Sequence, residues 1–84
     1  MADYGGDIER KKLRLASFEF NHACIKKLEA KQRQGYYGWD KVENKTNLES
    51  LFQEHKNRPL TQRNLIDIAN FCMFLWNLFE VQNK

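Results

Sequence analysis

The sequence predicts an all-α protein, a protomer of three helices over residues 7–34, 46–56 and 61–81 that assembles into a helical homo-oligomer. Apolar residues recur at three- and four-residue spacing through most of the chain, which is typical of helices with one buried face. The single proline, Pro59, separates two such segments. A length of 84 residues limits the chain to one small core. We therefore expect a flexible tail over residues 1–6 and one helical domain over residues 7–84.

The first predicted helix begins at Asp7, whose carboxylate can accept hydrogen bonds from the free N–H groups of the first turn. It ends near Gln34, because Gly35 adopts the left-handed cap conformation at little cost. One face is apolar and carries Leu13, Phe20, Cys24 and Leu28. The opposite side is basic and carries Arg10, Lys11, Arg14, Lys26, Lys27 and Lys31.

The second predicted helix is short, and the third is apolar on almost every side. Thr46 and Glu49 have the spacing of a capping box, which opens the second helix. Pro59 disfavours helix in the residue before it, and Thr61 then caps the third helix. Apolar residues surround the third helix from Leu65 to Val81.

An apolar circumference of this kind is typical of a central core helix or of a membrane span. The third helix is short for a span and includes four polar residues, Asp67, Asn70, Asn77 and Glu80. We therefore expect no membrane segment. Two short helices cannot cover every face of the third, so the remaining apolar face is expected to contact another copy of the chain, in a dimer or tetramer.

Charge and cysteine content narrow the class of protein. The formal net charge of +3 favours an anionic partner, but it is too small and scattered to predict nucleic-acid binding. The polar N-terminal residues predict no secretory leader, so the protein is expected in the cytoplasm. Cys24 and Cys72 lie in apolar helical surroundings, which favours reduced, buried thiols. His22 and His55 have no second ligand or nucleophile at a telling spacing, and both are expected to be surface or boundary residues.

The loop after the first helix is the first candidate for ligand binding. Three aromatic rings with flat faces suited to base stacking lie there: Tyr36, Tyr37 and Trp39. Three basic residues lie close by in sequence and could meet phosphate: Lys31, Arg33 and Lys41. The alternative is that these rings cover the open end of a helix bundle.

Two further groups of polar residues are candidates. Asp67, Asn70 and Asn77 fall in one narrow sector of the third helix, where an amide could pair with a base edge or a sugar hydroxyl. The alternative is a solvated edge, or a polar cluster that fixes the register of an oligomer. A basic run in the first helix, Arg10-Lys11-Lys12-Leu-Arg14, is either a solvated face or a phosphate-facing rim, to which Arg10, Lys11 and Arg14 would contribute.

Two segments carry a family resemblance. One is Lys31 with the run Gly35-Tyr-Tyr-Gly38-Trp39, and the other is the run Asp67-Ile-Ala-Asn70-Phe71-Cys-Met73. Together they resemble the entry and the closing segment of the site of MazG-like all-α nucleotide pyrophosphohydrolases, especially the small phage-type ones. The resemblance covers residues 31–77. It implies a helical fold, oligomers, magnesium and hydrolysis of nucleoside triphosphates.

The chain departs from this family in its acidic residues. About four carboxylates on two helices are needed to hold Mg²⁺ against a polyphosphate. Three residues before Asp67, where the family has Glu, this chain has Asn64. The acids of the second helix, Glu49 and Glu54, are five residues apart and point about 140° away from one another. The sequence therefore argues against catalysis and against a cofactor.

The favoured function is a non-catalytic nucleotide-binding oligomer, a phage sponge that sequesters a cyclic (di)nucleotide immune signal in the bacterial cytoplasm during infection. The ligand-binding residues are expected to be Tyr36, Tyr37, Trp39, Lys31, Arg33, Asp67, Asn70, Arg10, Lys11 and Arg14. One alternative is an inhibitor or adaptor that docks on a host protein. Another is a minimal Mg²⁺-dependent NTP pyrophosphohydrolase that draws on Glu49, Glu54 and Asp67 from different subunits.

Overall fold

The computed structural model describes residues 4–82 as three α-helices and one short 3-10 helix, which confirms the predicted all-α class. Helix α1 spans Tyr4–Arg33, the 3-10 helix η1 spans Val42–Asn44, α2 spans Lys45–Lys56 and α3 spans Gln62–Gln82. Residues 4–6 of the predicted tail are therefore helical, and residues 1–3 lie outside the described residues. No helix within residues 4–82 is long and apolar enough to cross a membrane.

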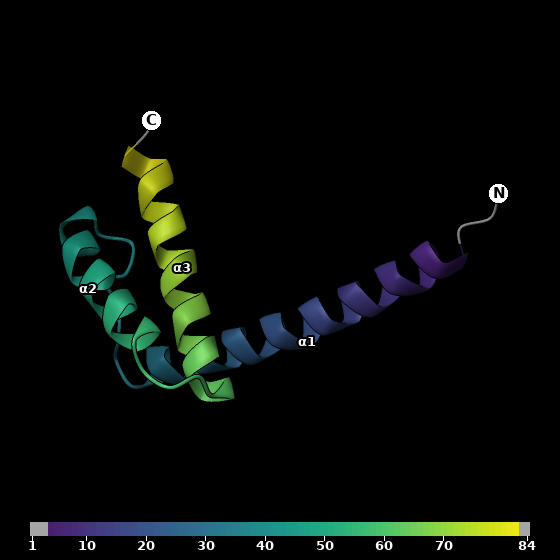
Figure 1. Ribbon diagram of the computed structural model, residues 1–84. Coiled ribbons are helices and arrows are strands. Elements are labelled where there is room, and N and C mark those ends of the chain that lie inside the picture. Colours follow the sequence, from purple (N-terminus) through teal and green to yellow (C-terminus); the bar gives the residue numbers. More distant parts are fainter. Residues whose placement is uncertain (1–3, 83–84) are drawn as a thin grey trace.

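The helices are arranged as a hairpin crossed by a long arm (Figure 1). α2 and α3 run antiparallel and side by side, and α1 crosses the end of this hairpin with its C-terminal part. The N-terminal half of α1 extends away from the other helices, and every side chain from Asp7 to His22 is exposed. The principal extents of 52 × 32 × 27 Å reflect this arm.

The core lies where the three helices meet and is small. Leu48 of α2, Leu78 of α3 and Cys24 of α1 are its buried apolar side chains, and Leu78 is only 1% exposed. Trp39 adds a ring from the loop, stacked on Phe74 with the ring centroids 5.3 Å apart. Three buried apolar side chains make a small core even for a chain of 84 residues.

The predicted helix ends are partly correct. Thr61 caps α3, because its Oγ1 accepts a hydrogen bond of 3.0 Å from the Asn64 backbone N–H. Gly35 has φ +92° and lies two residues beyond Arg33, the last residue of α1, so it takes the left-handed conformation predicted for the helix end. The predicted cap at Thr46 is wrong, since α2 begins one residue earlier and its first turn has no side-chain cap. Asp7 is wrong as a cap too, because it lies inside α1.

The predicted apolar face of α1 is buried over only part of its length. Cys24 is buried, whereas Leu13 and Phe20 are 59% and 46% exposed. The reason is geometric: α3 crosses α1 near Cys24 instead of running along it. Lys27, expected on the outer basic side, faces α3 for the same reason.

Candidate functional site

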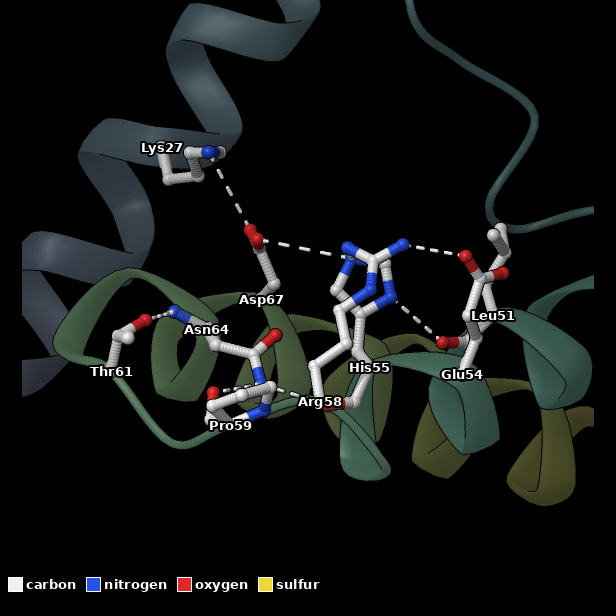
Figure 2. Close-up of polar contacts among 9 residues, drawn as sticks. All are labelled: Lys27, Leu51, Glu54, His55, Arg58, Pro59, Thr61, Asn64 and Asp67. Carbon is white, nitrogen blue, oxygen red and sulfur yellow. Dashed lines mark hydrogen bonds and ion pairs between the residues drawn. The ribbon is translucent and has the colours of Figure 1, made fainter.

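The three helices meet in a polar cluster formed by Lys27 of α1, His55 of α2 and Asp67 of α3, which we call the junction cluster (Figure 2). The Lys27 Nζ lies 3.6 Å from Asp67 Oδ1, and the His55 Nε2 lies 4.0 Å from Asp67 Oδ2. The side chains of Lys27, His55 and Asp67 remain 31%, 13% and 23% exposed. One carboxylate is therefore shared by two other helices and still reaches solvent.

His55 is held in a defined orientation. Its Nδ1 lies 2.8 Å from the Leu51 carbonyl oxygen, and a carbonyl can only accept, so Nδ1 carries the proton. In the neutral ring Nε2 is then an acceptor, and Arg58 Nη1 lies 3.3 Å from it. Arg58 also donates to Glu54. The ring of Phe71 lies 4.9 Å away and fixes the imidazole from the side.

Asn64 joins the end of α2 to the start of α3. Its side chain is buried, and its Nδ2 donates to the His55 carbonyl oxygen at 2.7 Å. A carboxylate at this position could not donate, and it would instead face the carbonyl oxygens of His55 and Pro59. The residue that replaces the resembling family's Glu is thus a structural amide in this fold.

A basic groove of about 450 Å³ adjoins the junction cluster between α1 and the first turn of α3. Its walls are formed by Ala23, Lys26, Lys27, Gln62, Arg63 and Ile66. Three of these residues are cationic, and the free N–H groups at the start of α3 add positive potential. The groove is therefore suited to an anionic group such as phosphate.

The aromatic loop is divided between the core and the surface. Trp39 stacks on Phe74, which agrees with the alternative that the rings cover the bundle. Tyr37 is 92% exposed and Tyr36 64% exposed, so both keep a free surface. The Lys31 Nζ lies 4.8 Å above the Tyr36 ring, as a cation–π pair.

Part of the predicted ligand-binding set lies along one side of the molecule. Lys31 follows Lys27 by four residues, so the two side chains lie on the same face of α1, roughly 6 Å apart along its axis. Lys27 is paired with Asp67, and Lys31 with Tyr36. Asp67, Lys31 and Tyr36 therefore belong to neighbouring parts of one surface. Arg33 is exposed at the end of α1.

The remaining predicted residues do not join this surface. Asn70 is buried, and its Nδ2 donates to the Cys24 carbonyl oxygen at 3.3 Å, so it links α3 to α1. Asn77 bonds to the Met73 carbonyl within its own helix. The basic run lies on the exposed arm, where Arg10 and Lys11 pair with Asp7.

Distance separates the basic run from the aromatic loop. Arg14 and Lys31 are 17 positions apart in continuous helix, a span of roughly 25 Å. A small ligand that contacts Tyr36 therefore cannot reach Arg14 of the same chain, and only the arm of another copy could bring those charges to it.

The acids of the enzyme alternative are not assembled in one chain. Among the described residues, no three His, Cys, Asp or Glu side chains lie close enough together to hold a metal ion. Glu54 is paired with Arg58, and Asp67 with Lys27. Glu49 is exposed on α2.

Sequence reasoning missed Lys27, His55 and Asn64 as members of one network. His55 and Asp67 meet because the Pro59 turn folds α3 back on α2, and the angle of that turn is not encoded in residue spacing. Asn64 did carry a signal, since it lies three residues after the cap Thr61. Comparisons of this chain with protein-family models, with curated proteins and with solved structures gave no match.

Proposed function

We propose that the protein is a non-catalytic nucleotide-binding oligomer, and that the groove lined by Lys26, Lys27 and Arg63 receives the phosphate. The convergence of these three cations beside the start of α3 is the observation that carries the proposal. Phosphate accepts charge-assisted hydrogen bonds from lysine and arginine, which are about twice as strong as neutral ones. The backbone N–H groups at the start of α3 reinforce the same preference.

The neighbouring residues supply contacts for the rest of a nucleotide. The Asp67 carboxylate is 23% exposed and can accept a hydrogen bond from a sugar hydroxyl or a base amine. Tyr36 and Tyr37 offer exposed rings, on which a base stacks with about 1–3 kcal/mol. A cyclic dinucleotide combines two phosphates with two bases, so it is the ligand class we favour.

Binding without turnover agrees with how the acids are used. Asp67 is paired with Lys27, and Glu54 with Arg58, so neither is a free oxygen ligand for Mg²⁺. Asn64 donates hydrogen bonds at a position where catalysis would need a carboxylate. A phage sponge for a bacterial immune signal requires tight binding and no product release, which this set of residues supports.

Isothermal titration against cyclic di- and trinucleotides and nucleoside triphosphates tests the proposal. We expect heat with at least one cyclic nucleotide, and we expect EDTA to leave it unchanged. Lys26→Ala and Arg63→Ala should each weaken binding at least tenfold, because both side chains line the groove and neither has a core contact. Lys12→Ala is the matched control, since it removes the same charge from the exposed arm.

Each outcome decides between functions. Absence of heat with every nucleotide rejects the proposal, as does an equal loss for Lys12→Ala, which would indicate a general charge effect. Pyrophosphate release that requires Mg²⁺ and is lost in Asp67→Ala would replace it with the enzyme alternative.

A second candidate function, docking on a host protein, is favoured by a separate observation. Tyr37 is 92% exposed, and Leu15 and Phe18 on the arm are 60% and 71% exposed. Exposed aromatic residues are frequent anchors of protein interfaces. Capture of one bacterial protein by the wild type and not by Tyr37→Ala, after nuclease treatment, would support an adaptor.

A further inference from the structure

The outer face of α3 is apolar and exposed, and it lies opposite the side that packs on the rest of the chain. On the packed side Asn70 bonds to Cys24, and the rings of Phe71 and Phe74 meet His55 and Trp39. We define the outer face as Leu65, Ile68, Cys72, Trp76 and Phe79. These five residues fall within about 80° of the helix circumference.

The outer face has no charged residue along its length. The charged residues of α3 are Arg63, Asp67 and Glu80. Asp67 turns inward to Lys27, and the other two lie beyond the ends of the face. Lys45 of α2 places its Nζ 3.7 Å from the Phe79 ring centroid. A second apolar surface can therefore cover the other four residues without burying a charge, provided that Lys45 stays at the rim.

The spacing of the outer face is symmetric about Cys72. Ile68 and Trp76 lie four residues before and after it, and Leu65 and Phe79 lie seven residues before and after it. A two-fold axis perpendicular to a helix exchanges positions at equal distances from the axis. An antiparallel pair about Cys72 therefore sets an apolar side chain against an apolar side chain at every position of the face.

We propose that α3 pairs antiparallel with α3 of a second copy, across a two-fold axis at Cys72. Ile68 then faces the partner's Trp76, and Leu65 faces the partner's Phe79, so each aliphatic side chain meets an aromatic one. The small Cys72 side chain lets the helices approach closely at the axis. Antiparallel pairing also aligns the helix dipoles favourably.

The outer face alone is smaller than a stable protein interface. Leu65, Trp76 and Phe79 are 43%, 66% and 47% exposed, although Lys45 lies over the Phe79 ring. These fractions amount to roughly 350 Å² of side-chain surface, whereas a stable interface buries about 800 Å² per partner. The pair of α3 helices thus supplies about half of a stable interface. We expect the remainder to come from other exposed apolar side chains, of which the α1 arm carries Leu13, Leu15 and Phe18.

This dimer is independent of nucleotide binding. Cys72 lies five residues after Asp67 and therefore about 140° from it around α3. Pairing through the outer face leaves the junction cluster and the basic groove open on the other side. A monomeric protein would thus exclude the oligomer but not nucleotide binding at the groove, and a protein that binds no nucleotide could still form this dimer.

Cross-linking of the full chain tests the axis. Oxidation of the micromolar protein by copper–phenanthroline should join two copies through Cys72, because thiols at a two-fold axis can reach the Cα separation of about 4.4–6.8 Å that a disulfide needs. Cys72→Ser should give no linked dimer. Ser50→Cys combined with Cys72→Ser is the matched control, since it presents an exposed thiol on α2. Equal linking in this control would overturn the proposal.

A mixing experiment tests the orientation. In the Cys72→Ser background, Ile68→Cys mixed with Trp76→Cys should give a linked heterodimer at least tenfold faster than either variant alone. Faster linking of Trp76→Cys to itself would indicate parallel helices and would overturn the antiparallel pairing.

Light scattering tests the association itself. The wild type should have at least the mass of a dimer at micromolar concentration, and Trp76→Lys should lower that mass while circular dichroism shows an unchanged helix content. Leu60→Lys is the control, because Leu60 is 70% exposed in the turn before α3. A monomeric wild type, or an equal effect of Leu60→Lys, would overturn the proposal.

Discussion

At the scale of single residues, Asn70 forms a buried polar link between α3 and α1. It is buried, and it bonds to the Cys24 carbonyl oxygen 46 positions away in the chain. Asn70→Ala removes this bond and leaves a void, so we expect a loss of about 1–3 kcal/mol in the free energy of unfolding. Asn77→Ala should cost less than about 1 kcal/mol, because its bond stays within α3. Urea unfolding measures both, and equal losses would contradict the assignment.

Cys24 predicts a dependence of stability on pH. Burial raises the pKa of its thiol above the ordinary value of 9.0, because the thiolate is disfavoured away from water. The folded state therefore holds this proton more tightly than the unfolded state. The resulting stability is fully present below pH 9.0 and is lost as the pH rises through the folded pKa.

The measurement is the free energy of unfolding at neutral and at alkaline pH. The wild type should lose more stability than Cys24→Val between the two, because valine has no proton to lose. A parallel decline of wild type and Cys24→Val would contradict the prediction.

Residue-scale predictions from the sequence succeeded where the chemistry is local. Thr61 was identified correctly because its hydroxyl needs only the N–H three residues ahead. Thr46 has the same spacing to an acid, but α2 begins at Lys45 and the cap is not formed. Lys27, His55 and Asp67 meet across three helices, and local spacing carries no information about such contacts.

At the scale of elements, the loop between α1 and η1 depends on Gly38. Its φ is +94°, and an added Cβ would lie 3.1 Å from Asn44 Nδ2, the atom that donates to the Gly38 carbonyl at 2.8 Å. Gly38→Ala should therefore cost about 1–3 kcal/mol and weaken the stacking of Trp39, seen by near-UV circular dichroism. Gly35→Ala has similar backbone strain but open space around it, so its cost should be smaller. A larger loss of stability for Gly35→Ala than for Gly38→Ala would contradict this role of Asn44.

We expect the amide hydrogens of the α1 arm to be protected from exchange with solvent only at high protein concentration. Every side chain from Asp7 to His22 is exposed, and a single helix without packing is marginally stable in water. Amide hydrogens of residues 8–18 should therefore exchange rapidly in dilute protein and slowly in concentrated protein, where another copy covers the arm. Mass spectrometry of peptides from this segment measures the effect. Rapid exchange at every concentration would exclude the arm from the interface.

Elements were predicted to within three residues because helix periodicity spans many positions. The predicted range 7–34 became Tyr4–Arg33, and 61–81 became Gln62–Gln82. The side of α1 that is buried could not be predicted. Leu13 and Phe20 continue the face of Cys24 in the sequence, but the crossing of α3 covers that face over only a short length.

At the scale of the whole molecule, the chain has more apolar surface than its own core can bury. The sequence indicated this surplus on the third helix, and Leu65, Trp76 and Phe79 are indeed exposed in the single chain. A second copy that pairs through α3 would cover these side chains. Assembly therefore remains a prediction that thermal stability can test.

Thermal unfolding at different protein concentrations provides that test. Association stabilises the folded state by mass action, so the Tm of the wild type should rise with concentration. With about 0.7 kcal/mol of unfolding enthalpy per residue, a dimer of this chain gains about 4 °C for each tenfold increase. Trp76→Lys should show a lower Tm that no longer depends on concentration, whereas Leu60→Lys should keep the slope of the wild type. A flat Tm for the wild type would mean that the chain folds alone and leaves the outer face of α3 in water.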